Sequence, residues 1–271
     1  MLLSKCIQNL TRTAKFCRSI SFGGDWKVNV IKVKNYDEMS EKATELIVNR
    51  INTLENPVLG LATGSTPEGL YQRTIKKFEQ KEVSFKNVTT FNLDEYVGLD
   101  KDDSNSYYYF MNEKLFRHVD IAMDRVHVPN GVAQDLEKEC MEHERAIEQA
   151  GGIDVQVLGI GGNGHIGFNE PGTSFSSRTH VVDLDESTIQ ANARFFNSID
   201  DVPTQAVSMG IETIMNSKEI LLLVSGEAKA DAMAKLLNGE VSEDFPASIL
   251  KQHENVTVIV DEAALTVAES K

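Results

Sequence analysis

The chain has 271 residues, of which 41% are hydrophobic, so it can bury a substantial core in one large domain or two small ones. Its formal net charge of −14 argues against a nucleic-acid partner, because the phosphates of DNA and RNA need a basic protein surface. An anionic small substrate remains open, since a few local cations and backbone N–H groups can hold one phosphate. No apolar run approaches the ~20 residues of a membrane-spanning helix, so we expect no membrane partner.

The three cysteines, Cys6, Cys17 and Cys140, do not form a disulfide framework, because their number is odd and two of them lie near the N-terminus. No C-x-x-C or H-E-x-x-H pattern occurs, so the sequence offers no metal-site spacing and we expect no metal. A reducing compartment fits this cysteine usage best, and we expect a cytoplasmic protein.

The first 26 residues differ from the rest, with four basic residues and a single acid. This composition is similar to that of an organellar transit peptide, but an extension without a role in the fold, or a start codon assigned too far upstream, explains it as well. We expect residues 1–27 to lie outside the fold. Residues 28–271 contain no linker, internal repeat or low-complexity segment, so we expect them to form a single domain.

Apolar, β-branched segments alternate with segments of helical periodicity along residues 28–271. The expected strands are residues 28–33, 58–62, 88–92, 153–160, 220–224 and 256–260, and the expected helices are residues 37–51, 67–75, 104–116, 134–149, 185–196 and 228–237. The alternation predicts an α/β fold with an open, mainly parallel sheet and helices on both faces, a Rossmann-like three-layer sandwich. In such a sheet the loops after the strands meet at one edge, where ligands bind.

The first of these loops reads Thr63-Gly64-Ser65-Thr66 and leads into a helix. Its small residues, its hydroxyls and the helix N-terminus make a cradle for an anion, although an ordinary helix cap explains the same residues. The G-K-[ST] ending of a nucleotide-binding loop is missing, which argues against a nucleotide.

The second loop places Asp94 directly after an apolar strand and Glu95 beside it. Adjacent acids at a strand end are often only solvated. Asp94 is the better candidate for a base, because Glu95 points the other way if the backbone stays extended.

The third loop, residues 158–171, surrounds His165 with glycines and sets Asn163 and Glu170 nearby. Glycine lets backbone N–H groups approach a ligand closely, and a neutral imidazole takes or gives a proton near neutral pH. A carboxylate close by can hold the ring in one orientation. The pattern indicates an active-site loop, while a strand followed by a structural turn is the alternative.

Two cations, Arg194 and Lys229, complete the set of candidate ligand-binding residues. Arginine can grip a phosphate with two donors, whereas lysine acts as a point charge. Surface salt bridges are the alternative interpretation for both.

Several motifs together resemble the glucosamine-6-phosphate deaminase family, in order along nearly the whole chain from about residue 28 to about residue 263. They are LGLATGSTPEGLY (59–71), FNLDEYVGL (91–99), NSYYYFM (105–111), LGIGGNGHIGFNEPGT (158–173), ANARFF (191–196) and SGEAKA (225–230). The related 6-phosphogluconolactonases have a similar fold and a similar Gly-His turn but lack the FNLDEY and FNEP segments.

The resemblance implies conversion of glucosamine 6-phosphate to fructose 6-phosphate with loss of ammonia, without metal or organic cofactor. Asp94 would move the proton from C2 to C1, and His165 would assist ring opening. Glu170 and Asn163 would orient and tune His165. The residues that would hold the substrate and its phosphate are Thr63, Gly64, Ser65, Thr66, Gly159, Arg194 and Lys229.

Two positions distinguish this chain within the resemblance. Some members have Asp in place of Asn163, and an Asn should stabilise an imidazolium less because it carries no charge. Members activated by N-acetylglucosamine 6-phosphate carry Arg and Lys where this chain has His180 and Val182, so we expect weak or absent allosteric activation. A lactonase-like enzyme, another sugar-phosphate isomerase and a non-catalytic sugar-phosphate sensor remain alternatives, and a homo-oligomer stays open.

Overall fold

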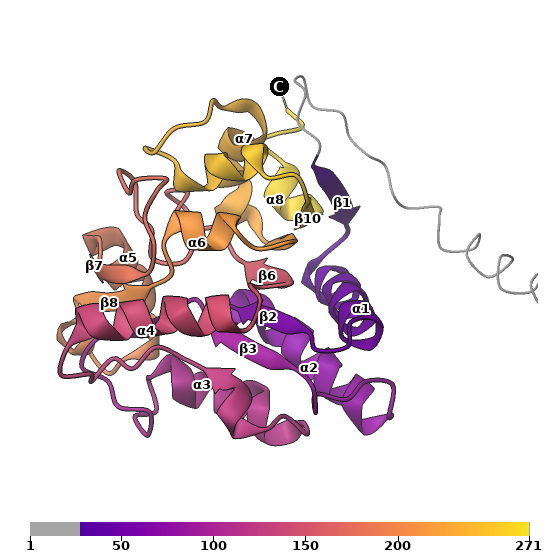
Figure 1. Ribbon diagram of the computed structural model, residues 1–271. Helices are drawn as coiled ribbons and strands as arrows, with labels where there is room; N and C mark the ends of the chain where they lie inside the picture. The colour runs from indigo at the N-terminus through magenta and orange to yellow at the C-terminus, as the bar shows by residue number, and fades with distance from the viewer. Residues whose placement is uncertain (1–27, 271) are drawn as a thin grey trace, which may run out of the picture.

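The computed structural model describes residues 28–270 (Figure 1). Within them, seven parallel strands form a large sheet in the order β1-β10-β9-β6-β2-β3-β5. Their bounds are β1 Asn29–Val33, β2 Val58–Leu61, β3 Thr89–Asn92, β5 Val126–His127, β6 Val155–Leu158, β9 Ile220–Val224 and β10 Val256–Asp261. A second, antiparallel sheet has the order β4-β8-β7, formed by β4 Asp94–Tyr96, β8 Gln205–Ser208 and β7 His180–Asp183.

Helices connect the strands of the large sheet. The α-helices are α1 Tyr36–Thr53, α2 Ser65–Glu79, α3 Tyr107–Lys114, α4 Leu136–Gln149, α5 Glu186–Asn192, α6 Ile211–Met215, α7 Ala230–Asn238 and α8 Glu262–Leu265. Short 3₁₀ helices are η1 Phe116–His118, η2 Met123–Arg125, η3 Ala193–Phe195, η4 Ile199–Asp201, η5 Glu227–Lys229 and η6 Pro246–Gln252. Asn35 and Asp135 cap α1 and α4 in the usual way, because each side chain accepts a backbone hydrogen bond from the first turn.

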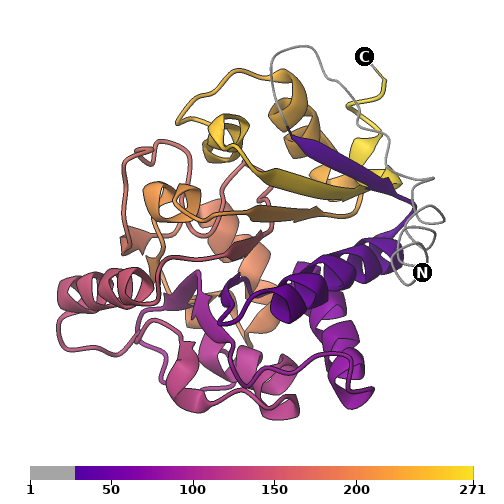
Figure 2. The same ribbon diagram turned by 45° about the vertical axis from the view of Figure 1, so that its right-hand side comes forward.

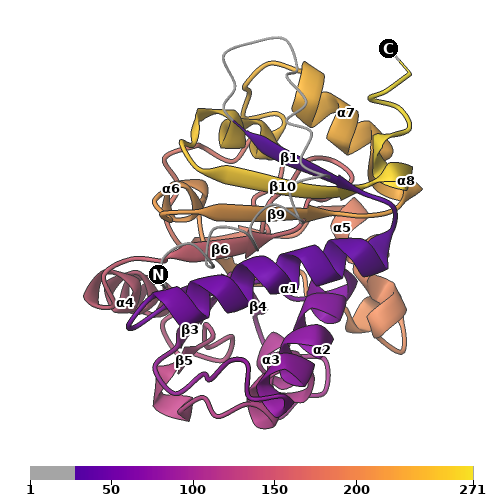
Figure 3. The ribbon, with the colours of Figure 1, turned by 90° about the vertical axis from the view of Figure 1, so that its right-hand side faces the viewer.

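The large sheet separates two apolar cores. Alternate residues of β9 face opposite sides, so Leu222 joins one core and Leu221 the other. Helices α1, α2 and α3 cover the side of Leu221, and α4, α6, α7 and α8 cover the side of Leu222. Figure 2 shows α1, in indigo, and the yellow C-terminal helices on opposite sides of β9 and β10, and Figure 3 shows α1 lying across the sheet. The predicted three-layer α/β architecture is therefore confirmed.

The small antiparallel sheet was not expected from the sequence. The chain changes sheets at Leu93, whose N–H bonds the carbonyl of Leu61 in the large sheet while its own carbonyl accepts from Met209, just after β8. Strand β3 therefore ends at Asn92, and β4 begins at Asp94 in a different sheet. The residue pair that the sequence placed after one strand is in fact the start of another.

Two helices are shorter than predicted. The expected helix at 104–116 is α3 followed by a separate 3₁₀ turn, and the expected helix at 185–196 is α5 followed by η3. The expectation that residues 1–27 lie outside the fold falls outside the described residues. Within residues 28–270, no helix has the length and apolar character required to cross a bilayer.

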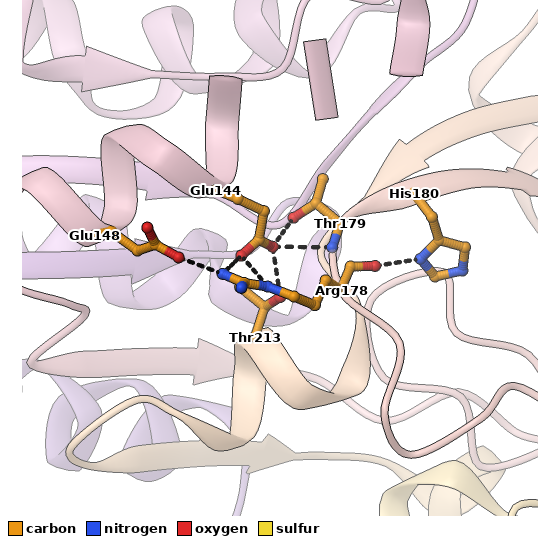
Figure 4. A network of polar contacts seen from close by, with 6 residues as sticks. All are labelled: Glu144, Glu148, Arg178, Thr179, His180 and Thr213. Atoms are coloured by element: carbon orange, nitrogen blue, oxygen red, sulfur yellow. Dashed lines mark hydrogen bonds and ion pairs between the residues drawn. The ribbon is translucent and has the colours of Figure 1, made fainter. Parts of the chain in front are cut away.

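One buried carboxylate fastens α4 to the start of β7 (Figure 4). Glu144 accepts hydrogen bonds from the backbone N–H and the hydroxyl of Thr179, from Thr213 on α6 at 2.5 Å, and from Arg178 at 2.6 Å. Arg178 also contacts Glu148, one turn further along α4. The segment that follows the His165 loop is thereby anchored to both the helix and the neighbouring α6.

Candidate active site

The loop between β2 and α2 exposes an open helix N-terminus. Gly64 adopts φ 85°, a conformation that favours glycine, and no described side chain caps the helix that begins at Ser65. A cavity of about 440 Å³ adjoins this turn, lined by Tyr36, Ser65, Thr66, Glu68, Gln72 and Ser225. The cavity brings Ser65 and Thr66 of the expected anion cradle together with Ser225, which follows β9. The free N–H groups and the helix dipole favour an anion at this end of α2.

Asp94 is a buried carboxylate held at the junction of the two sheets, with a side chain that is almost inaccessible to water. Burial and, to a smaller extent, the neighbouring charge of Glu95 together raise its pKa to about 8. A buried carboxylate with a raised pKa is a stronger proton acceptor when ionised. Asp94 therefore has the properties of a general base rather than those of a surface acid.

Asp94 lies next to the His165 loop, although 70 residues separate them in the chain. A Cβ added to Gly167 would lie only 3.8 Å from Oδ2 of Asp94 and 3.2 Å from Oγ of Ser208. Gly167 has φ 58° and no side chain, so the loop can approach the carboxylate closely. The structure thus brings together two predicted site loops from different strands.

The imidazole of His165 packs flat against the backbone of its own loop. A Cβ at Gly161 would come within 2.4 Å of the ring, so only glycine fits there. The backbone N–H of Gly161 also donates to the carbonyl of His165 at 2.9 Å, which closes the turn. The glycines of this loop therefore position the ring and do more than allow a ligand to approach.

Glu170 is the centre of the polar contacts around His165. Its Oε2 accepts from Nδ2 of Asn163 at 2.7 Å and lies 3.3 Å from Nδ1 of His165, a close approach without hydrogen-bond alignment. Its Oε1 accepts from the hydroxyl of Thr188 at 2.5 Å. Burial alone would raise its pKa, but contacts with His165, Thr188 and Asn163 outweigh burial and lower it. Glu170 is therefore ionised beside the ring.

Asn163 contacts Glu170 and the backbone N–H of His165, which it accepts at 3.1 Å. Its side chain therefore orders the loop and the carboxylate. No pattern in the sequence distinguishes Thr188, a threonine within an expected helix, and its contact with Glu170 is visible only in the fold.

The positive charges of Arg194 and Lys229 influence each other. Burial lowers the pKa of Lys229, and the positive charge of Arg194 lowers it further. Within residues 28–270 neither residue forms an ion pair, so the salt-bridge interpretation does not describe them. Two cations without an ion-pair partner among the described residues favour an anion, and Lys229 lies four residues after Ser225 of the cavity.

The remaining predicted residues are also placed near these loops. Thr63 lies near the hydroxyl of Tyr107, whose pKa is raised chiefly by burial. Gly159 has open space where a side chain would lie. Among the described residues, no group of three or more His, Cys, Asp or Glu side chains could hold a metal ion.

Comparison with known proteins gives this arrangement a family. The family described as glucosamine-6-phosphate isomerases/6-phosphogluconolactonase matches residues 34–259. A glucosamine-6-phosphate deaminase of Oceanobacillus iheyensis is 63% identical over 238 residues, covering 88% of this chain and 95% of that protein. A glucosamine-6-phosphate deaminase of Shouchella clausii is 58% identical over 244 residues, covering 90% of this chain and 99% of that protein.

Solved structures agree with the sequence relatives. A structure described as a monomeric glucosamine-6-phosphate deaminase superposes with a TM-score of 0.87 at 53% identity, covering 88% of this chain and 99% of that one. A 6-phosphogluconolactonase from Thermotoga maritima reaches a TM-score of 0.70 at 22% identity, covering 87% and 100% of the two chains, and shares the fold alone. The chain therefore belongs to the glucosamine-6-phosphate isomerase/6-phosphogluconolactonase family, among its glucosamine-6-phosphate deaminase members.

Proposed function

We propose that this protein is a glucosamine-6-phosphate deaminase, which converts glucosamine 6-phosphate and water to fructose 6-phosphate and ammonia. The observation that carries the proposal is the buried Asp94 beside Gly167 of the His165 loop, with a pKa raised to about 8. Moving a proton between two carbons needs a strong base shielded from water, and Asp94 meets both conditions. The two deaminases named above align with 88% and 90% of this chain and support the same assignment.

We assign the carbon chemistry to Asp94. After ring opening, the ionised carboxylate removes the C2 proton, and the freed electron pair forms a C1–C2 double bond while the C1=O π pair moves to O1, which takes a proton from water. The same carboxyl group returns its proton to C1 as the nitrogen lone pair forms a C2=N bond, and the surplus proton on nitrogen passes to water, which leaves an imine at C2. Water adds to that imine and ammonia departs, giving the ketone of fructose 6-phosphate. One positioned acid–base group thus serves two successive transfers.

His165 is the group proposed for ring opening. Breaking the C1–O5 bond requires a proton at O5 and removal of one from O1, and an imidazole can carry out both transfers. Glu170 stays ionised beside Nδ1 and fixes the ring's orientation, while Asn163 holds Glu170 and the backbone of His165. This division of roles leaves the second ring nitrogen for the substrate.

The phosphate is proposed to bind between the N-terminus of α2 and the two cations. Thr63, Gly64, Ser65 and Thr66 offer hydroxyl and backbone donors, and Arg194 and Lys229 offer positive charge. Gly159 leaves room for the sugar. Anchoring the phosphate fixes the distance from the sugar carbons to Asp94, which is how binding energy reaches the reacting atoms.

A lactonase would use His165 to activate water but would need no carbon base, so it leaves Asp94 without a role. A non-catalytic sensor would need the phosphate cradle alone. The decisive experiment is ammonia release from glucosamine 6-phosphate by the native chain and by Asp94→Asn. We expect release by the native chain and a loss of at least about a thousandfold in the variant. No release by the native chain, or full activity in Asp94→Asn, would overturn the assignment.

We extend the proposal to the whole protein as follows. Residues 28–271 act as one catalytic domain, since both sheets contribute to the site. The cysteine usage supports a cytoplasmic location, and the described Cys140 is buried and unpaired with another cysteine. The structure described as a monomeric deaminase leaves a monomer and a homo-oligomer equally open for this chain.

A further inference from the structure

Thr188 is a buried residue of α5 that contacts the active-site loop from outside the large sheet. Its hydroxyl donates to Oε1 of Glu170 at 2.5 Å, and its side chain is 4% exposed. Along the chain, α5 comes between β7 and β8 of the small sheet, whereas Glu170 belongs to the loop after β6 of the large sheet. The bond therefore joins two segments that are supported by different sheets. The contact is charge-assisted and shielded from water, which makes it one of the stronger kinds of side-chain hydrogen bond.

The two oxygens of Glu170 have different partners, and this gives the Thr188 bond its importance. Oε2 serves Asn163 at 2.7 Å and His165 at 3.3 Å, whereas Oε1 serves Thr188. A carboxylate with one oxygen held elsewhere cannot rotate freely about its terminal bond. The hydroxyl of Thr188 therefore fixes the plane in which Oε2 faces the imidazole.

The same helical segment carries Arg194. The backbone N–H of Ala193 bonds the carbonyl of Ile189, so η3 continues directly from α5. Arg194 comes six positions after Thr188, about 9 Å along a helix axis. The positive charge of Arg194 helps to lower the pKa of Lys229, and both residues belong to the proposed phosphate site.

We infer that Thr188 is a positioning residue through which phosphate binding at Arg194 sets the orientation of Glu170 against His165. This inference rests on the proposed function and adds a connection between the phosphate site and the ring-opening group. Phosphate held by Arg194 fixes α5, α5 fixes the hydroxyl of Thr188, and that hydroxyl fixes Glu170. A bound phosphate then stabilises the orientation of Glu170 against His165 that the Thr188 hydroxyl sets.

The test compares Thr188→Val, which has nearly the same shape but no O–H donor, with Thr188→Ser, which keeps the donor. We expect Thr188→Val to lower kcat at least about tenfold with a much smaller change in KM, and Thr188→Ser to stay within about threefold of the native chain. The matched control is Thr213→Val, which loses a 2.5 Å hydroxyl bond to Glu144 away from the site. It should lower the unfolding temperature and leave kcat unchanged.

A double-mutant cycle separates the coupling from simple damage. Arg194→Lys should lower kcat in the native background but have little further effect on kcat in Thr188→Val, because the connection is already broken. Additive effects, native kcat in Thr188→Val, or an equal loss in Thr188→Ser would overturn the inference. If ammonia release and its dependence on Asp94 persist in those cases, the proposed function stands and the coupling alone fails.

A measurement on the native chain covers the case in which Thr188→Val does not fold. The ring-proton NMR signals of His165, identified by their loss in His165→Gln, are followed as inorganic phosphate is added. We expect them to shift in the native chain and to shift much less in Thr188→Ala and in Arg194→Lys. An unresponsive signal in the native chain, or an equal response in Thr188→Ala, contradicts the inference.

Discussion

Glu95 accepts the backbone hydrogen bond of Tyr107 at 2.9 Å and so caps the helix that Tyr107 begins. Its carboxylate also accepts from the N–H groups of Tyr108 and Tyr96. Burial raises the pKa of Glu95 to about 7, although these three hydrogen bonds act in the opposite direction. The residue directly after the proposed base is therefore a fixed and partly charged neighbour, which both places Asp94 and raises its pKa.

Removing the charge of Glu95 should make Asp94 a weaker base. In Glu95→Gln we expect the pKa of Asp94 to fall, because a nearby like charge disfavours ionisation. The acid limb of kcat/KM against pH, which reports the free base, should move to lower pH. The exposed Asp102→Asn serves as the control and should leave the limb in place. A limb that stays fixed in Glu95→Gln as well would show that Glu95 acts only as a helix cap.

The proposed base should reduce the stability of the fold at alkaline pH. The pKa of Asp94 is raised from 3.8 to about 8 in the folded protein, so its contribution to stability is complete below about pH 4 and is lost as pH rises through 8. Asp94→Asn should therefore be more stable than the native chain by about 1–3 kcal/mol at pH 8.5, with almost no difference at pH 4. Urea unfolding at both pH values measures this difference in the free energy of unfolding. Equal differences at the two values would contradict the raised pKa.

The sequence was sufficient for the parts of this fold that repeat a local pattern. Six of the seven strands of the large sheet and the site segments around Asp94 and His165 follow from apolar runs and the residues that end them, whereas β5 has only two residues and was missed. The small sheet could not be predicted in the same way, because β7 and β8 have four residues each and pair only after the chain changes sheets at Leu93.

The supporting residues were missed for a related reason. Glu95 and Thr188 act through partners 12 and 18 residues away, and nothing in the residues themselves announces those contacts. The extended backbone predicts that Glu95 points away from Asp94. In the structure its carboxylate accepts hydrogen bonds from the first backbone N–H groups of α3. Residue types that carry out chemistry are visible in a sequence, whereas the side chains that hold them in place depend on the finished fold.

Glu144 should be essential for stability. Its carboxylate is buried, and although burial raises its pKa, hydrogen bonds from Thr179, Thr213 and Arg178 outweigh that effect and lower it. Glu144→Gln keeps the shape but sets an amide against several donors, so we expect a loss of about 2–4 kcal/mol at pH 7. Because the folded pKa is depressed, the loss should shrink as pH falls below about 4.5, the ordinary value for Glu.

The control for Glu144 lies on the same helix. Glu142 forms an exposed pair with Lys138 at 3.5 Å, and Glu142→Gln should change the free energy of unfolding by less than about 0.5 kcal/mol. Urea unfolding of both variants gives the comparison. If the two substitutions cost the same, the network of Figure 4 contributes no more than a surface ion pair.

The segment after the His165 loop should not respond to N-acetylglucosamine 6-phosphate. His180 and Val182 stand where activated members of the family carry Arg and Lys, and Val182 is buried in the small-sheet core. The nearby Arg178 is already held by Glu144 and Glu148, so it is not a free cation for a phosphate. We expect hyperbolic initial rates that the acetylated sugar phosphate leaves unchanged at concentrations below inhibition. A sigmoidal curve that the acetylated sugar converts to a hyperbola would place an activator site elsewhere and defeat this reasoning.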